Sequence, residues 1–260
     1  MDRRKFIKTL GTGAAAIGAA SITGCIDKSP TASENPQGSI PTDQMTLREN
    51  HNSGDQVSLL GYGMMRLPTR KNGKGEEEFD QEQINRLVDY AIDHGVNYFD
   101  TSPVYCQGQS ERLTGIALHR HPRTSYYIAT KLSNFSPDTQ SREASIEMYE
   151  NSLHDLQTDY IDYMLLHSVG DSMEDFDTRF VKNGMLKYLQ REREAGRVRN
   201  LGFSFHGQQE VFDEMMKLHD EVHWDFVQIQ MNYLDWHHAH ELNDFNVNAD
   251  YLYGELHKRN

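Results

Sequence analysis

Two kinds of apolar segment alternate along most of this chain. Short runs of apolar and aromatic residues predict buried β-strands, whereas longer stretches with apolar residues three and four positions apart predict amphipathic helices. The clearest apolar stripe consists of Ile84, Leu87, Val88, Ala91 and Ile92. It follows Asp80 and Gln83, which are spaced as a capping box, and it stops at Gly95, so we expect a helix there.

The order of the elements predicts an α/β fold. Strands are expected at 57–60, 97–100, 126–130, 161–166, 199–204 and 226–230. Further helices are expected at 110–118, 142–156, 185–195 and 209–218, with a final helix or loop at 239–257. Because strands alternate with helices, the units are right-handed β-α-β crossovers and the sheet is parallel. No G-x-G-x-x-G motif follows a strand, so the fingerprint of a Rossmann dinucleotide-binding fold is missing.

The N-terminus has a different pattern. Arg3 and Arg4 precede a Gly/Ala-rich apolar stretch that is too short to be a stable spanning helix. The stretch ends in Ile-Thr-Gly-Cys25, which resembles a lipobox. We therefore expect residues 1–24 to be a twin-arginine signal peptide and Cys25 to carry lipid. The alternative, a soluble N-terminal helix, leaves the paired arginines and the small residues before the cysteine unexplained.

The predicted domain plan follows from this leader. Residues 25–55, which are rich in Ser, Pro, Thr and Asn at first, are expected to be a lipidated cysteine with a flexible tether and lead-in. Residues 56–260 contain the alternating elements. The protein is then an exported, periplasmic or cell-envelope lipoprotein that touches the membrane through its N-terminal lipid only.

Composition narrows the function. The formal net charge is −13, which argues against a nucleic-acid partner, because such proteins neutralise phosphates with Lys and Arg. The chain has two cysteines, too few for a disulfide framework or a four-thiolate zinc site. His237, His238 and His240 fit no zinc-binding spacing, so no metal site is predicted.

Polar residues with catalytic potential follow successive predicted strands. Asp100, Lys131 and His167 each end a strand, and Tyr105 lies in the loop after the second one. In a β/α barrel these strand ends meet at one mouth, where active sites form. A buried Lys131 needs a partner, and Asp100 is the obvious one. An ammonium group near a tyrosine lowers the phenol pKa, which suits proton donation to a carbonyl, whereas the hydride must come from a cofactor.

Several motifs in this order resemble the aldo/keto reductase family. They are Gly95-Val-Asn-Tyr-Phe-Asp100-Thr, Gly108-Gln-Ser-Glu111, Ala129-Thr-Lys131 and Asp162-Tyr-Met-Leu-Leu-His167. The resemblance implies a (β/α)8 TIM barrel, here truncated after about six β/α units. It also implies reduction of an aldehyde or ketone, or the reverse reaction, with NADP(H), or NAD(H) as the alternative, and with a tyrosine as general acid.

The resemblance assigns roles to particular residues. The catalytic set is Asp100, Tyr105, Lys131 and His167. The cofactor-binding set is Gly63, Met64, Met65, Asp100, Ser204 and Gln228. The leader together with the barrel resembles an exported subgroup that carries a C-terminal ferredoxin-like extension. That extension is not in this sequence, which has no C-x-x-C-x-x-C motif, so an iron–sulfur cluster is expected only if an extension exists beyond this chain.

Two alternatives to an active enzyme stay open. A non-catalytic protein that binds cofactor and a partner can use the same scaffold, because fold does not fix function. An incomplete or inactive gene product is the other, since six strands would form an open sheet with two unpaired edges. The substrate, the direction of the reaction and the oligomeric state are not determined by the sequence.

Overall fold

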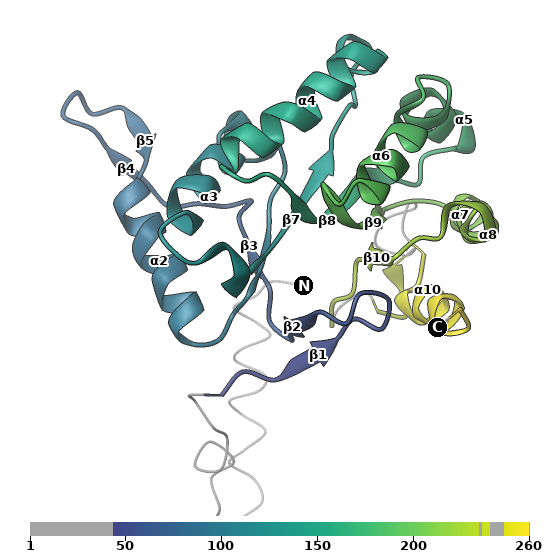
Figure 1. The fold of residues 1–260 in the computed structure, drawn as a ribbon, viewed down its shortest axis with the longest axis horizontal. Coiled ribbons are helices and arrows are strands. Elements are labelled where there is room, and N and C mark those ends of the chain that lie inside the picture. The colour runs from purple at the N-terminus through teal and green to yellow at the C-terminus, as the bar shows by residue number, and fades with distance from the viewer. Residues whose placement is uncertain (1–43, 234–235, 240–246, 260) are drawn as a thin grey trace, which may run out of the picture. The chain divides into compact units, whose positions relative to one another are not determined.

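In the computed structural model, residues 44–233, 236–239 and 247–259 are described (Figure 1). The signal peptide, the lipobox with Cys25 and most of the tether predicted from the sequence lie outside these residues, as does His240. No helix within the described ranges is long and apolar enough to cross a lipid bilayer.

Six parallel strands form the central sheet, in the order β10-β9-β8-β7-β6-β3. Their bounds are β3 Tyr62–Gly63, β6 Tyr98–Asp100, β7 Tyr127–Leu132, β8 Ile161–Val169, β9 Val198–Phe205 and β10 Phe226–Ile229. Chain order equals spatial order, as in a β/α barrel, and β3 and β10 are the two edges among the described strands. The structure therefore shows the predicted partial (β/α)8 barrel with six strands.

The major helices lie outside the strands in an arc (Figure 1). They are α2 Gln81–Asp93, α3 Ser110–Leu118, α4 Arg142–Asp155, α6 Met185–Glu194, α7 Gln209–Lys217 and α10 Ala249–His257. Shorter helices are α5 Met173–Phe176 and α8 His219–Val222, with single turns η2 Tyr105–Gly108, η3 Arg123–Ser125, η4 Pro137–Thr139 and η5 Asp177–Val181. The start of α2 is as predicted: the Asp80 carboxylate accepts the Gln83 N–H at 3.0 Å.

The core lies between the helices and the sheet. Ile84, Val88 and Ala91 of α2 are buried against Phe99 of β6 and Ile128 of β7, as the apolar stripe predicts. A second cluster joins β8 and β9 to α4, α6 and α7. On the inner face of the sheet, Tyr163 packs edge-on against Tyr98, Tyr127 and Phe226. This inner aromatic cluster fills the space below the polar ends of the strands.

The first barrel strand lies later than predicted. The run 57–60 does not enter the central sheet, because β2 (Gln56–Ser58) pairs antiparallel with β1 (Leu47–Glu49). Leu59 and Leu60 are more than 60% exposed, so this apolar run is not a core segment. The Asn97 side chain bonds the backbone of Gln56 and Ser58 and holds β2 across the start of β6. The sheet instead begins at β3.

Two segments expected to be irregular are ordered. Part of the predicted tether and lead-in, residues 44–55, contains β1 and a turn whose Asn50 and Asp55 bond Tyr163 of β8 at 3.3 and 2.8 Å. The charged segment 71–78, whose composition is typical of a solvated loop, contains the turn and adjoining ends of an antiparallel hairpin formed by β4 (Thr69–Lys71) and β5 (Glu77–Phe79). The polar composition of these two segments gives no sign of regular structure. The hydrogen-bond partners of residues 44–55 are distant in sequence, and those of the β4–β5 hairpin lie on the surface.

Candidate active site

Asp100 and Lys131 form a buried ion pair at the carboxyl ends of β6 and β7. The Lys131 ammonium donates to Asp100 Oδ1 and to the Thr101 carbonyl oxygen, both at 2.7 Å. The Lys131 side chain is only 1% exposed. A buried ammonium is costly without partners, so these two acceptors make its position tolerable. The pair expected from the sequence therefore forms.

Tyr105 lies against this pair. The Lys131 Nζ is 4.7 Å from the centroid of the Tyr105 ring, within the range of a cation–π contact. The next two residues, Cys106 and Gln107, have φ values of 51° and 57°, a left-handed conformation that non-glycine residues rarely adopt. The Cys106 thiol donates to the Met65 carbonyl at 3.3 Å and ties the turn to the segment after β3.

The pKa of Tyr105 is raised, whereas the sequence predicts that a nearby ammonium group lowers it. Burial of the phenol, reinforced by the negative charge of Asp100, raises the pKa of Tyr105 to about 12. Lys131 faces the ring and is bonded to Asp100, so its charge does not dominate at the hydroxyl. Burial also lowers the pKa of Lys131, against the attraction of Asp100. In the free protein the phenol is therefore a protonated group at every ordinary pH.

His167 completes the group from β8. Its ring meets the Tyr105 ring edge to face, with centroids 5.8 Å apart. Its Nδ1 is 2.5 Å from Ser133 Oγ and 3.4 Å from Ser102 Oγ, and the two serine hydroxyls are 2.9 Å apart. Burial, followed by the positive charges of Lys131 and Arg179, lowers the pKa of His167 to about 3. The imidazole is therefore neutral near pH 7.

Three residues near this site escaped the sequence reasoning. Ser102 and Ser133 contact His167, and the Phe135 ring lies 4.9 Å from the His167 ring. Ser133 had a detectable signal, because it is two residues after Lys131. Side chains two apart along a strand project to the same side, and Ser133 continues that direction just past the end of β7. Phe135 is more than one-third exposed, in the loop after β7.

The three residues expected near a cofactor, at the end of β3 and just after it, differ in the exposure of their side chains. Gly63 is the register partner of Asp100, and a Cβ placed on it would meet no atom within 4 Å. Met64 has its side chain fully buried in the core, so only its backbone can face a ligand. Met65 is 52% exposed. The structure thus leaves Gly63 and Met65 accessible and turns the Met64 side chain away.

Ser204 and Gln228 are direct register partners on β9 and β10. Ser204 is buried, and its Oγ accepts the Ser168 N–H at 2.8 Å, which leaves its own hydroxyl hydrogen for another acceptor. Gln228 is exposed on the edge strand. The two side chains therefore belong to the same stretch of sheet, two and three strands away from Lys131.

One unsatisfied atom fits a bound cofactor. Asp100 Oδ2 is buried and has no hydrogen-bond partner among the described residues. Buried carboxylate oxygens are nearly always bonded, so an orphan one indicates a missing donor. Gly63, beside Asp100, leaves space for a ligand. A sugar hydroxyl of a dinucleotide is a donor of the required kind, so the residues present fit NADP(H).

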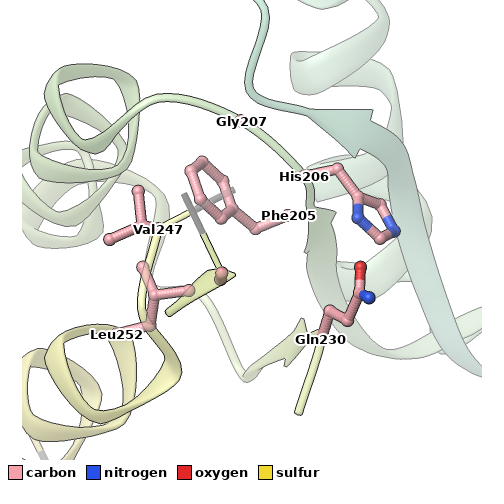
Figure 2. Close-up of a pocket in the computed structure, with 7 residues that line it drawn as sticks. Phe205, His206, Gly207, Gln230, Val247 and Leu252 are labelled. Carbon is pink, nitrogen blue, oxygen red and sulfur yellow. The ribbon is translucent and has the colours of Figure 1, made fainter. Parts of the chain in front are cut away.

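Cavities also lie away from the group of Asp100, Tyr105, Lys131 and His167. At the ends of β9 and β10 a space of about 10 Å³ is lined by Phe205, His206, Gly207, Gln230, Ala239, Val247 and Leu252 (Figure 2). It holds one water at most. A cavity of about 450 Å³ lies between the β1–β2 turn, β10 and α10, lined in part by Trp224, Met231 and Tyr253. Neither includes a predicted catalytic residue.

Candidate metal ligands do not cluster within the described residues. Across residues 44–233, 236–239 and 247–259, no three His, Cys, Asp or Glu side chains are placed to hold a metal ion. The groups around Lys131 and His167 suit proton transfer and carbonyl orientation.

Comparison with known proteins gives a consistent match. The aldo/keto reductase family model matches residues 59–250. Probable aldo-keto reductase 1 of Glycine max is 34% identical over 147 residues, covering 52% of this chain and 41% of that protein. A Klebsiella pneumoniae aldo-keto reductase in complex with NADPH superposes with a TM-score of 0.57 at 22% identity, over 82% of this chain and 66% of that one. The holo form of a Bacillus halodurans aldo-keto reductase gives 0.54 at 23% identity, over 81% and 76%. The match to the Glycine max protein thus spans less than half of its length.

Proposed function

Since the chain belongs to the aldo/keto reductase family, we propose that it transfers hydride between NADP(H) and the carbonyl group of a small aldehyde or ketone. The observation that carries this proposal is the buried Lys131–Asp100 pair beneath Tyr105, with a neutral His167 at the edge of the same ring. Reduction and the reverse oxidation use the same groups.

Tyr105 acts as the general acid. NADPH held at this site would supply the hydride, and negative charge would then develop on the substrate carbonyl oxygen. With a pKa of about 12, the Tyr105 hydroxyl keeps its proton at neutral pH. An alkoxide is a stronger base than a phenolate, so it can take that proton. The Lys131 ammonium against the ring stabilises the phenolate that remains.

His167 orients the carbonyl. The shortest contact of Ser133 Oγ is with His167 Nδ1, at 2.5 Å, so we assign Ser133 as the donor and Nδ1 as the acceptor. Neutral imidazole in that tautomer carries its proton on Nε2. This N–H is the group that hydrogen-bonds the substrate carbonyl oxygen and holds it near Tyr105.

Cofactor binding uses the open side of the same mouth. Asp100 Oδ2 would accept a hydrogen bond from a ribose hydroxyl, with Gly63 and Met65 beside it, and Ser204 and Gln228 would bond the nicotinamide amide. The orphan oxygen of Asp100 and the open space at Gly63 support this assignment. NADP(H) and NAD(H) are distinguished by comparing the affinities of the two reduced cofactors.

The test is turnover of the purified chain. NADPH or NADH absorbance is followed with a panel of aldehydes and ketones, for the wild type and for Tyr105→Phe. Loss of the general acid should lower kcat/KM by about 10² to 10⁴-fold. Tyr163→Phe is the matched control, because it removes a tyrosine hydroxyl at the opposite end of the sheet. Equal turnover in the wild type and Tyr105→Phe contradicts the proposal, and so does cofactor binding with no turnover of any carbonyl.

We propose the export and anchoring of the protein from the leader pattern alone. Arg3, Arg4 and Cys25 fit a twin-arginine signal with a lipobox. Expression of the full chain followed by membrane fractionation tests this. Cys25→Ala should release the exported protein into the soluble periplasmic fraction, and Arg3→Lys combined with Arg4→Lys should block export. Membrane attachment unchanged by Cys25→Ala contradicts lipid anchoring.

A further inference from the structure

One arginine lies buried directly behind the candidate active site. Arg179 is in η5, the turn after α5, and its side chain is 2% exposed. A guanidinium in such a place is costly unless its donors are bonded. The chemistry proposed above gives Arg179 no direct role, so its partners indicate why it is there.

The partners of Arg179 include the backbone at the end of β8. Its Nη2 donates to the His167 carbonyl oxygen at 2.5 Å, and its Nη1 donates to the Ser168 carbonyl oxygen at 3.3 Å. The Nη1 group also contacts the Asp175 carboxylate at 2.9 Å, which balances the charge. The planar guanidinium fork thus holds two successive carbonyl groups, a geometry that a lysine cannot reproduce.

Those two carbonyls lie in an irregular part of the strand. The pairing of β8 with β9 shifts register between Leu166 and Val169, and Ser168 has a φ of 52°. A β-bulge of this kind turns a side chain in a new direction and is common beside active sites. The Ser168 N–H is taken by Ser204 Oγ at 2.8 Å. Arg179 and Ser204 together therefore hold the bulge that presents His167.

Arg179 also reaches the neighbouring loop after β7. Its guanidinium carbon is 4.6 Å from the centroid of the Phe135 ring, and its Nε donates to Asn134 Oδ1 at 3.4 Å. The Phe135 ring in turn lies 4.9 Å from the His167 ring. The guanidinium therefore contacts both the backbone of His167 and the ring that packs against its imidazole.

We propose that Arg179 is a positioning residue, whose guanidinium fork holds the His167–Ser168 bulge and the Phe135 ring and thereby aims the imidazole at the substrate carbonyl. The effect on turnover rests on the proposed function. The placement of the His167 ring against Ser133 does not, so it can be measured without a substrate.

The first arm of the experiment is kinetic. Arg179→Met removes the fork while keeping an apolar side chain of similar length, and it should lower kcat by about 10²-fold, because small misplacements of reacting groups have effects of that size. The KM for NADPH should stay within about twofold. Arg179→Lys keeps the charge but donates to a single carbonyl, so it should recover only part of kcat. If Arg179→Met does not fold, the reduced kcat of Arg179→Lys decides the kinetic arm.

Arg193→Met is the matched control. Arg193 also bonds two successive carbonyls, those of Val222 and His223 at 2.8 and 2.7 Å, and it pairs with Asp225. None of these groups belongs to the site. We expect Arg193→Met to lower the unfolding temperature and to leave kcat unchanged. An equal loss of kcat in both methionine variants would show that Arg179 acts only through general stability, and it would overturn the proposal.

The second arm is independent of turnover. Nitrogen NMR of the His167 ring reports which tautomer is present and whether Nδ1 accepts a hydrogen bond. The wild type should show a single neutral tautomer with the proton on Nε2, and Arg179→Met should show a mixture. Unchanged His167 signals in Arg179→Met overturn the proposal. A wild type without turnover contradicts the proposed function, and the spectra then still decide the role of Arg179.

Discussion

Each end of the parallel sheet holds an aspartate, and the hydrogen bonding of the two carboxylates differs. At the amino end, Asp162 of β8 has both carboxylate oxygens bonded, to Arg199 at 3.2 Å and to Arg123 and the Ile128 N–H at 2.6 and 2.9 Å. At the carboxyl end, Asp100 bonds Lys131 through one oxygen, and its other oxygen has no partner among the described residues. Asp162 is fully buried and has both oxygens bonded, whereas Asp100 is 19% exposed and keeps one buried oxygen without a partner.

The surroundings repeat this contrast. At the amino end, Asp55 accepts hydrogen bonds from Tyr163 and Asn200, which closes the base of the sheet. At the carboxyl end, Tyr105 has its pKa raised to about 12 and His167 has its pKa lowered to about 3 by burial. Burial also raises the pKa values of Asp162 and Tyr163 at the amino end, so the contrast lies in the hydrogen bonds. Satisfied networks stabilise a fold, whereas a buried carboxylate oxygen without a donor indicates a place for a ligand. The difference favours a structural role for the amino end and supports the carboxyl end as the proposed reaction site, as in other β/α barrels.

The largest effect on stability should come from breaking the network at the amino end. Arg123→Met leaves the buried Asp162 carboxylate with one arginine partner. We expect a loss of about 3 kcal/mol in the free energy of unfolding, at the low end for a broken buried ion pair because Arg199 stays. Urea unfolding measures it. NADPH affinity should not change, and a large loss of affinity would show that the two ends are not separate in function.

Glu111 of α3 should link stability to pH. It is buried, bonded by the hydroxyls of Thr130 and Ser152 at 2.5 and 3.1 Å, and burial raises its pKa from 4.5 to about 7. The folded protein then holds this proton more tightly than the unfolded chain. The contribution is present below pH 4.5 and is lost as the pH rises through about 7, so the free energy of unfolding should fall by about 3 kcal/mol over that interval.

Glu111→Gln sharpens this prediction. The amide does not titrate, so the variant should lack that part of the pH dependence and should gain stability relative to the wild type at pH 8. Urea unfolding of both proteins from pH 4.5 to pH 8 gives the comparison. Parallel stability curves for the two proteins would show that Glu111 is not the titrating group.

Tyr163→Phe should have a smaller effect. It removes the hydroxyl that donates to Asp55 at 2.8 Å and keeps the ring inside the aromatic cluster. The hydroxyl also accepts a hydrogen bond from the Asn50 side chain at 3.3 Å. We therefore expect a loss of about 2 kcal/mol in stability, since one hydrogen bond contributes about 1 kcal/mol. Thermal unfolding checks it, and kcat should be unchanged. A loss of turnover without a loss of stability would show that the amino end of the sheet takes part in the reaction, and it would contradict the separation of the two ends.

The smallest effect is expected on the pH profile of carbonyl reduction. With the pKa of Tyr105 at about 12 and that of His167 at about 3, neither group titrates between pH 5 and pH 9. The rate of reduction should therefore be nearly constant there, and oxidation of an alcohol, which needs the phenolate, should rise with pH. A reduction rate that falls tenfold between pH 6 and pH 8 would contradict this assignment of proton donor.

The sequence predicted what depends on local pattern. The helical stripe of α2 and the polar residues that end β6, β7 and β8 could be predicted because periodicity and strand ends are visible in the order of residues. The strand 57–60 was misplaced, because an apolar run does not reveal whether it joins the parallel sheet or, as β2 does, pairs across its base. The pKa of Tyr105 was also predicted in the wrong direction, since burial cannot be measured from sequence.

Arg179 illustrates the limit most clearly. Its partners are mainly backbone carbonyls in a bulge, and it lies in a turn without apolar periodicity. No side-chain pattern links position 179 to position 167. The same holds for Asp55, which looked like part of a polar tether although it bonds Asn200 and Tyr163. Groups that act through distant or backbone partners become visible only in three dimensions.

The most direct test of the contrast is to make the same substitution at both ends. At position 100, an asparagine can use its side-chain oxygen to accept the hydrogen bond from Lys131. Its NH2 group then takes the place of Oδ2, where no other donor lies. At position 162, donors face both oxygens, so the NH2 of an asparagine must meet one of them. In hydrogen-bond geometry alone, an amide therefore fits position 100 better than position 162, although at position 100 it also removes the charge that faces the buried Lys131 ammonium.

The measurement is the free energy of unfolding together with the dissociation constant for NADPH, for Asp100→Asn and Asp162→Asn. The account predicts that Asp162→Asn lowers stability by about 3 kcal/mol with unchanged NADPH binding, because it breaks a buried ion pair. Asp100→Asn should weaken NADPH binding at least tenfold, and it should also lower stability by about 3 kcal/mol, because it removes the charge that faces the buried Lys131 ammonium. NADPH binding unaffected by Asp100→Asn, or weakened equally by Asp162→Asn, would contradict the assignment of the carboxyl end as the cofactor and reaction site.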